Sequence, residues 1–440
     1  MQNQNLIKKI IIALIILVIG VGIFFGVTFY QASKATQTAT RGGSNTNPTR
    51  TPFQTRVATG SDITIIQDQA TPTTEIENPT PTVNLPTEEP RLVELWKAPT
   101  SGFDFINKDI QVLATTTRGT STVTITKTLK NQPYIYLWDR ATGNIYENLA
   151  STSVVVRISN FTSPEVQEAF FITPTTVVTR ELDSNNESII TSYIQLAKET
   201  SSSTLFTATK KRIYLNSEHI SISQDNKKMF YILKDSGQAF VSNTDMSSVL
   251  RVLTTNITQW LPQYVNKATL ALTTKPSAYY PGYLFFLNAS GTEDNQYILG
   301  DKYGFTTLVS PDGSKVLYNE ILDDSLLTSI YNTKTKTSIT LSQATLSEKC
   351  VWSNDSKRVY CAIPQQLNTA PYPDVWYQGL TSFSDNIWSI DSGTGQFELE
   401  IALQDQLTVD IDAYNLKISA DQKYLLFQDK YSLHLWKYRL

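Results

Sequence analysis

The chain has 440 residues and a formal net charge of −3. Its charged residues are scattered, with no basic stripe of the kind that follows a phosphate backbone, so the sequence argues against a nucleic-acid partner. It contains 22 Tyr, 18 Phe and 7 Trp but only 3 Met. Because aromatic and β-branched residues fit a pleated, half-buried surface, this composition favours an all-β core.

A long apolar segment near the N-terminus predicts a membrane anchor. Residues 10–30 carry no charge and are rich in Ile, Leu and Val. At ~1.5 Å per residue, a helix of this length spans the ~30 Å hydrocarbon core of a bilayer. Lys8 and Lys9 precede it, so the positive-inside rule places residues 1–9 in the cytoplasm and the rest of the chain outside the cell membrane. A secretory signal peptide is the alternative, although its apolar region usually has only ~7 to 15 residues.

Two glycines in this segment, Gly22 and Gly26, form a G-x-x-x-G pattern. Such a pattern lets two membrane helices approach closely, so a homodimer is one interpretation. Glycine is also common in membrane helices that do not associate.

The segment that follows predicts a tether. Residues 31–90 are dominated by Thr, Ser, Pro, Gln and Asn, as in the stretch Asn78-Pro79-Thr80-Pro81-Thr82. A segment of this composition cannot bury enough apolar area to offset the entropy lost on ordering. We expect a disordered stalk between the anchor and residues 91–440.

A repeated motif organises the remainder of the chain. It reads Ser, any residue, Asp, a small or polar residue and Lys, followed by a hydrophobic strand. Its clear copies begin at Ser223, Ser310, Ser353 and Ser419, with a degenerate copy at Asn266. The Asp side chain accepts backbone hydrogen bonds two residues on, which is typical of a tight hairpin turn. The motif is therefore structural in the first place.

A second landmark, a strand ending in Asp or Asn before a polar turn, sets the number of units. Its copies lie at Asp139, Asn243, Asn288, Asn332 and Asp391. The intervals predict seven four-stranded units at 103–149, 154–197, 213–253, 258–299, 305–341, 348–401 and 415–440. The last unit has only three strands, and Arg91 to Trp96 can supply its fourth. A ring closed in this way has no exposed edge. The expected fold is a seven-bladed β-propeller of four-stranded antiparallel blades, preceded by one transmembrane helix and a disordered linker.

The string from Ser310 to Tyr318, Ser-Pro-Asp-Gly-Ser-Lys-Val-Leu-Tyr, resembles the TolB-type, WD-repeat-like propeller units of bacterial envelope proteins. The resemblance covers residues 91–440 and is clearest in the last five units. It implies the fold. It does not specify a function, because this repeat occurs in envelope-assembly factors, in propeller domains of peptidases and elsewhere.

Two cysteines, Cys350 and Cys361, lie on the strands that flank the turn from Ser353 to Ser356. In a regular hairpin they face each other across neighbouring strands, and an extracytoplasmic location permits oxidation, so a disulfide is expected. The alternative is a pair of small buried hydrophobic residues.

Two aromatic-rich expansions predict a binding surface. Segments 276–283 and 371–385 fall between the second and third strands of their units, where propeller loops share one face. Such loops offer stacking area with a few fixed polar groups. The candidate ligand-binding residues are Trp376, Tyr377, Asp374, Tyr372, Tyr279, Tyr280 and Tyr283. The alternative is that these aromatics pack the loops onto their own domain. A third expansion, 116–132, is interpreted as an extra Thr-rich hairpin.

Catalytic chemistry is poorly represented. The chain has only two histidines, His219 and His434, both at expected strand positions, so we predict no catalytic residue, no metal site and no cofactor. Asp410 and Asp412 are expected on one strand face. The favoured function is a membrane-tethered, extracytoplasmic binding or scaffolding module for a protein, peptide or glycan. The alternative is an envelope glycan hydrolase that uses loop carboxylates at Asp374, Asp385, Asp410 and Asp412.

Overall fold

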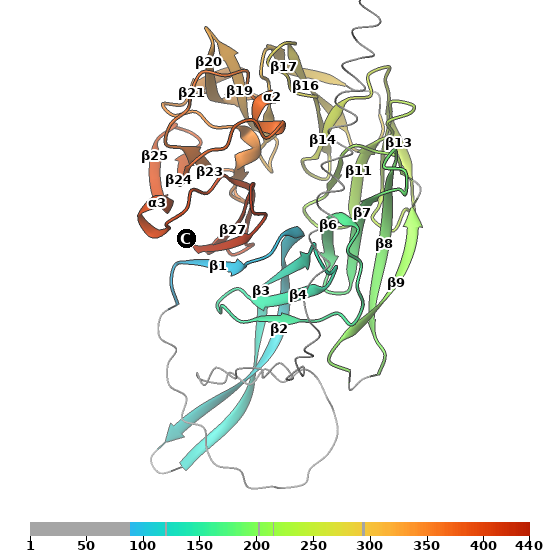
Figure 1. The fold of residues 1–440 in the computed structure, drawn as a ribbon, viewed down its shortest axis with the longest axis vertical. Helices are drawn as coiled ribbons and strands as arrows, with labels where there is room; N and C mark the ends of the chain where they lie inside the picture. The colour runs from blue at the N-terminus through green and yellow to red at the C-terminus, as the bar shows by residue number, and fades with distance from the viewer. Residues whose placement is uncertain (1–88, 119–120, 201–202, 214, 293–294) are drawn as a thin grey trace, which may run out of the picture. The chain divides into compact units, whose positions relative to one another are not determined.

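Seven four-stranded antiparallel sheets follow one another around a ring in the computed structural model (Figure 1). The structure describes residues 89–440 except 119–120, 201–202, 214 and 293–294, and for 114–125 only the backbone. The predicted seven-bladed propeller is confirmed. Within each blade the strands are named A to D from the centre of the ring outward.

The strands of the first four blades are as follows. Blade one consists of β2 (Thr100–Arg118), β3 (Ser121–Asp139), β4 (Ile145–Leu149) and β5 (Val155–Arg157). Blade two consists of β6 (Val166–Thr173), β7 (Thr176–Leu182), β8 (Ile189–Lys198) and β9 (Phe206–Ile213). Blade three consists of β10 (Ile220–Ile222), β11 (Lys228–Ile232), β12 (Gln238–Asn243) and β13 (Leu250–Thr254). Blade four consists of β14 (Trp260–Tyr264), β15 (Thr269–Thr274), β16 (Gly282–Asn288) and β17 (Gln296–Lys302).

The remaining three blades complete the ring. Blade five consists of β18 (Thr307–Val309), β19 (Lys315–Leu322), β20 (Ser325–Asn332) and β21 (Thr337–Thr340). Blade six consists of β22 (Cys350–Trp352), β23 (Arg358–Pro364), β24 (Asp385–Asp391) and β25 (Phe397–Ile401). Blade seven consists of β26 (Ala413–Ile418), β27 (Tyr424–Asp429), β28 (Leu435–Arg439) and β1 (Leu92–Trp96). In the part of the chain that the structure describes, three short helices lie in loops, namely η1 (Ser347–Lys349), α2 (Asp374–Tyr377) and α3 (Leu403–Gln406).

The repeated motif forms the A–B turn of its blade, as predicted. In blade five, Ser310 Oγ donates a hydrogen bond to Asp312 Oδ1 at 2.7 Å, and the backbone N–H of Lys315 donates to Ser310 Oγ at 2.9 Å. Gly313 takes a φ of 74°, a left-handed conformation that glycine adopts without strain. The same Ser-to-Asp hydrogen bond recurs in the A–B turns of blades three, six and seven.

The ring closes between the N-terminal strand of the propeller and the C-terminal strand of the chain. β1 pairs antiparallel with β28, from Leu92 opposite Tyr438 to Trp96 opposite Leu435. The predicted fourth strand of blade seven is therefore confirmed. Because β1 occupies the outer position of that blade, residues 339 to 346 positions apart in sequence pair within one sheet.

The predicted boundaries of blades one and two were wrong. β5 begins at Val155 and belongs to blade one, although blade two was expected to start at 154. The outer strand of blade two is β9, which starts at Phe206, beyond the expected end at 197. The recurring Ser-x-Asp turn is absent from this part of the sequence, so only tertiary pairing sets these strands.

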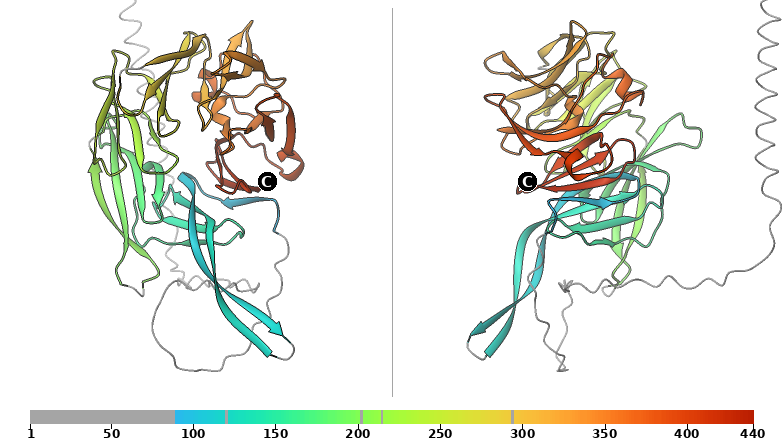
Figure 2. Two further views of the ribbon diagram at one scale, coloured as in Figure 1. Left: turned by 180° about the vertical axis from the view of Figure 1, so that it is seen from behind. Right: turned by 60° about the vertical axis from the view of Figure 1, so that its left-hand side comes forward.

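The Thr-rich expansion is not a separate hairpin. β2 and β3 each have 19 residues and pair from Thr100 opposite Asp139 to Arg118 opposite Ser121. The register shifts twice, between Thr100 and Gly102 and between Lys108 and Ile110. The expansion is thus a continuation of the A–B hairpin of blade one, which projects from the ring as a two-stranded arm (Figure 2).

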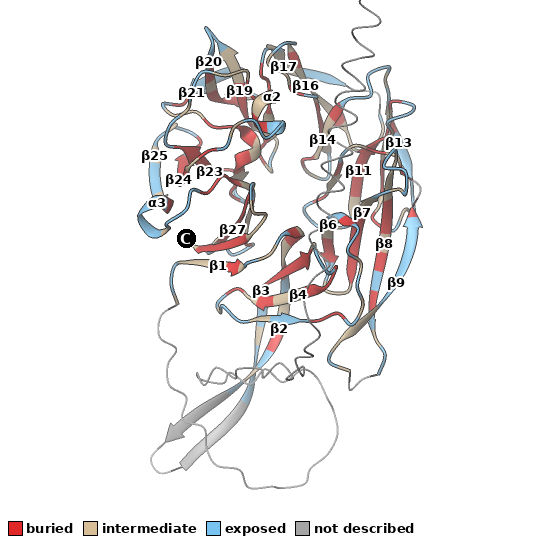
Figure 3. Cartoon of the chain, in the orientation of Figure 1, coloured by how far each residue is buried: buried red, intermediate tan, exposed pale blue. Residues whose placement is uncertain are grey.

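Burial follows the blade geometry (Figure 3). The B strand β23 is buried at every residue except Arg358, whereas all four residues of the outer strand β21 are exposed. Cys350 and Cys361 face each other across β22 and β23, with sulfur atoms 2.11 Å apart in a disulfide.

Among residues 89–440, as far as they are described, no helix has the length and apolar character needed to cross a membrane. The anchor predicted at 10–30, its Gly22 and Gly26, and the stalk lie outside the described residues, apart from the last two stalk positions.

Candidate functional site

The two aromatic-rich segments are both B–C loops, as predicted, and they contact each other. One lies between β15 and β16 of blade four, and the other lies between β23 and β24 of blade six. The Asp374 carboxylate accepts a hydrogen bond from the backbone N–H of Ala278 at 2.6 Å and one from Ser277 Oγ at 3.3 Å. Loops from two blades that are not neighbours therefore form one surface.

A third loop joins this surface. The backbone N–H of Gly304, which follows β17, donates to the carbonyl of Ser277 at 2.7 Å. These three connected loops carry exposed side chains that we call the tyrosine patch. Its members are Tyr279, Tyr280, Tyr303, Tyr377 and Leu380. Tyr279 and Tyr280 are 64% and 75% exposed, and Tyr377 is 40% exposed.

Two of the predicted ligand-binding residues lie beneath the patch. Tyr372 and Trp376 are buried, and their rings lie among Phe383 and neighbouring apolar side chains. Trp376 Nε1 donates to Asp412 Oδ2 at 2.9 Å. These side chains support the loop from below, as the packing alternative described. Tyr283, in β16, is half-buried.

A buried ionic cluster anchors the blade-six loop, and the sequence had not indicated it. Lys349, Asp385 and Asp412 are all 0% to 1% exposed. Lys349 Nζ donates to Asp385 Oδ2 at 2.7 Å and to Asp412 Oδ1. The three residues come from η1, the start of β24 and the loop before β26, separated by 36 and 63 positions, so no local pattern marks them.

The cluster holds one positive charge against two carboxylates. Burial and, to a smaller extent, repulsion from Asp412 raise the pKa of Asp385 to about 7, although the Lys349 ammonium group acts in the opposite direction. Among the described residues, Asp385 Oδ1 has no hydrogen-bond partner. A proton bound to Asp385 neutralises the excess negative charge of the cluster. Because all three side chains are buried and contact each other, we interpret the cluster as a structural element at the base of the loop.

The remaining acid and histidine positions differ from expectation. Asp410 and Asp412 do not share a strand face, because both precede β26; Asp410 is exposed and Asp412 is buried. His219 and His434 lie just before β10 and β28 and not within them. His434 Nδ1 is 2.7 Å from Glu94 Oε1. In the part of the chain that the structure describes, no group of three or more His, Cys, Asp or Glu residues could hold a metal ion.

The known proteins to which the chain is similar are solved structures of low sequence identity. No protein-family model matches the chain, and a search of curated proteins gave no match. Among solved structures, the chain is similar to an oligogalacturonate lyase from Vibrio parahaemolyticus, with a TM-score of 0.44 and 11% identity over 76% of this chain and 98% of that chain. It is also similar to TolB from Acinetobacter baumannii, with a TM-score of 0.39 and 8% identity over 75% of this chain and 79% of that chain.

A putative TolB from Agrobacterium tumefaciens has a TM-score of 0.36 and 14% identity over 51% of this chain and 74% of that chain. The repeat motif predicted a TolB-like propeller, and TolB structures are among those to which the chain is similar in fold.

Proposed function

We propose that this chain is a membrane-tethered, extracytoplasmic β-propeller that acts as a binding or scaffolding module for a protein, peptide or glycan. The proposal depends on one observation, the hydrogen-bonded bridge from Asp374 to Ala278 and Ser277. This bridge joins loops of blades four and six and leaves the tyrosine patch exposed above them.

The chemistry of the patch favours recognition. Tyrosine offers a large amphipathic contact area with little side-chain entropy to lose, and it is enriched among residues that dominate binding energy. The loops are supported by buried Trp376 and Tyr372 and by the Lys349 cluster. A surface held in place before binding loses less entropy when a partner arrives.

The hydrolase alternative gains no support from the positions of its carboxylates. Glycoside hydrolysis uses two carboxyl groups that face the sugar from ~5 to 9.5 Å apart. Asp385 and Asp412 are instead buried against Lys349, and Asp374 is bound to the other loop. Of the four candidates, only Asp410 is exposed, and Ser384 Oγ donates to it at 2.8 Å.

The proposal is tested by capture from envelope extract with the full-length protein. Replacing both Tyr279 and Tyr280 by Ala is expected to reduce the captured partner by about tenfold or more, because truncation of central aromatic residues costs at least ~1 to 2 kcal/mol. The matched control is Tyr297→Ala in the outer strand of the same blade, a tyrosine that is 58% exposed. Equal capture by the double variant and the wild type would refute the role of the patch.

A further inference from the structure

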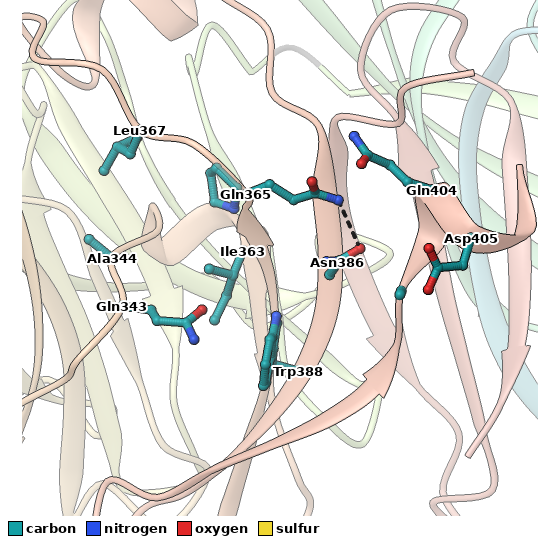
Figure 4. A pocket seen from close by; sticks show the side chains of 11 residues that line it. Gln343, Ala344, Ile363, Gln365, Leu367, Asn386, Trp388, Gln404 and Asp405 are labelled. Atoms are coloured by element: carbon teal, nitrogen blue, oxygen red, sulfur yellow. Dashed lines mark hydrogen bonds between the residues drawn. The ribbon is translucent and has the colours of Figure 1, made fainter. Parts of the chain in front are cut away.

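A cavity of about 610 Å³ opens at the end of blade six (Figure 4). It lies where the root of the B–C loop meets the loops that enter and leave the blade. Gln343 and Ala344 form one side, Gln404 and Asp405 form the other, and Trp388 lies between them (Figure 4). Its volume is in the range of ~300 to 1,000 Å³ that is usual for small-ligand sites.

The lining is rich in side-chain amides. Four amides from three different loops and one strand converge on it, namely Gln343, Gln365, Asn386 and Gln404. Each amide presents both a carbonyl acceptor and an NH₂ donor. This combination matches a ligand whose hydroxyl groups each donate and accept hydrogen bonds.

Two polar groups of the lining are available to a ligand, whereas Gln404 Nε2 already donates to Ser384 Oγ and to Asp410 Oδ1. Within the described part of the chain, the Gln343 side chain has no hydrogen-bond partner, and neither does Trp388 Nε1. Asn386 Oδ1 accepts from the backbone N–H of Leu403 at 2.9 Å and from Gln365 Nε2 at 3.5 Å (Figure 4), and these two contacts hold the Asn386 amide at the root of the loop.

An aromatic ring completes the lining. Trp388 is half-buried, and its orientation is held by an edge contact with Phe397, whose ring centroid is 6.1 Å away at an interplanar angle of 82°. The electron-rich face of an indole attracts the weakly positive C–H groups of an apolar ring face. A sugar ring has such a C–H face as well as hydroxyl groups at its edge.

The charge of the lining limits the ligand further. Asp405 is the one ionisable residue among the eleven that line the cavity, and there is no Lys or Arg. A phosphate, sulfate or uronate group would meet a carboxylate with no cation to offset it. A neutral ligand is therefore favoured over an acidic one.

From this combination of four amides, an oriented indole and no basic group, we infer that the cavity on blade six binds a neutral carbohydrate, with a sugar ring on Trp388 and its hydroxyl groups on the amides. The site is separate from the tyrosine patch, and the inference goes beyond the proposed function by naming a ligand class for a second position.

The test is isothermal titration calorimetry on the full chain, kept in a detergent without a sugar headgroup. The probes are chitotriose, cellotriose, maltotriose and mannotriose as neutral sugars, trigalacturonate as the acidic sugar and tri-alanine as the peptide. At least one neutral trisaccharide should bind, and trigalacturonate should bind about tenfold more weakly or not at all.

Variants locate the binding. Gln343→Ala should weaken the neutral sugar by about three- to tenfold, the usual effect of losing one neutral hydrogen bond. Its matched control is Gln224→Ala, an exposed glutamine in the A–B turn of blade three, which should have no effect. Trp388→Ala should abolish measurable binding. If the tryptophan variant does not fold, Gln343→Ala still provides the test, because the glutamine side chain makes no hydrogen bond to the described residues and its loss should not affect folding.

Three results would overturn the inference. The first is that no neutral trisaccharide binds at millimolar concentration. The second is that binding is unchanged in Gln343→Ala. The third is that tri-alanine binds with the same dependence on the cavity residues. The Tyr279→Ala, Tyr280→Ala variant separates the two proposals, because it should lose partner capture and keep sugar binding.

Discussion

Lys349 is the residue on which the base of the blade-six loop depends. Its ammonium group is fully buried and hydrogen-bonded to Asp385 and Asp412, and it lies 4.9 Å from the centroid of the Phe383 ring. Asp412 in turn accepts hydrogen bonds from Trp376 Nε1 and from the backbone N–H of Phe383. The lysine thus connects the ionic cluster to the aromatic side chains beneath the tyrosine patch.

Lys349→Met should lower the free energy of unfolding by about 3 to 5 kcal/mol, because it leaves two buried carboxylates without a cation. The matched control is Lys357→Met, whose lysine is 80% exposed and 4.0 Å from Asp355. This change should cost less than about 1 kcal/mol. Urea unfolding monitored by circular dichroism measures both values, and equal losses in the two variants would contradict the structural role of Lys349.

The same variant carries a pH dependence. In the wild type, the pKa of Asp385 is raised to about 7 in the folded protein, above its value in the unfolded chain. Between these two pKa values, the folded state therefore binds more protons than the unfolded state. Loss of the Lys349 charge raises the pKa of folded Asp385 further and so extends this pH range upward. The stability lost in Lys349→Met should therefore be smaller at pH 5 than at pH 8, because protonation removes the uncompensated charge.

At the scale of the secondary-structure elements, β1 is the strand that closes the ring. Leu95 points into a buried cluster with Phe103, Leu426 and Leu435, which joins blades one and seven. The seam therefore combines main-chain pairing with a shared apolar core.

Leu95→Ala should lower the free energy of unfolding by about 2 to 4 kcal/mol, from lost transfer energy and the cavity that remains. Leu399→Ala, in the outer strand of blade six, is the matched control, because Leu399 is 47% exposed. Its cost should stay below about 1 kcal/mol. If Leu95→Ala were as stable as this control, β1 would not hold the ring together.

At the scale of the whole molecule, the proposal places the propeller outside the cell membrane on a tether. The full chain should fractionate with membranes, and removal of residues 1–30 should release it, since a helix of ~20 apolar residues inserts stably. Protease added to intact cells stripped of their outer layers should digest the stalk and release the propeller. A full chain that stays in the soluble fraction would contradict the tether.

Local chemistry was enough to predict much of the fold. The Ser-x-Asp turn forms its hydrogen bonds within five residues, as Ser310, Asp312 and Lys315 do, so the sequence marks each copy directly. Cys350 and Cys361 were placed opposite each other by their symmetry about one turn. Blade two lacks that turn, and its boundaries were predicted wrongly for this reason.

The sequence by itself therefore determined the number of blades, the closing strand and the position of the two aromatic loops on one face, because turn chemistry and strand alternation act over a few residues. Only the tertiary structure decided that Asp374 reaches Ala278, that Trp376 is buried while Tyr280 is exposed, and that Lys349 pairs with Asp385 and Asp412. Those contacts join residues 36 to 96 positions apart, and they depend on how the blades and their loops pack around the ring, which no local pattern encodes.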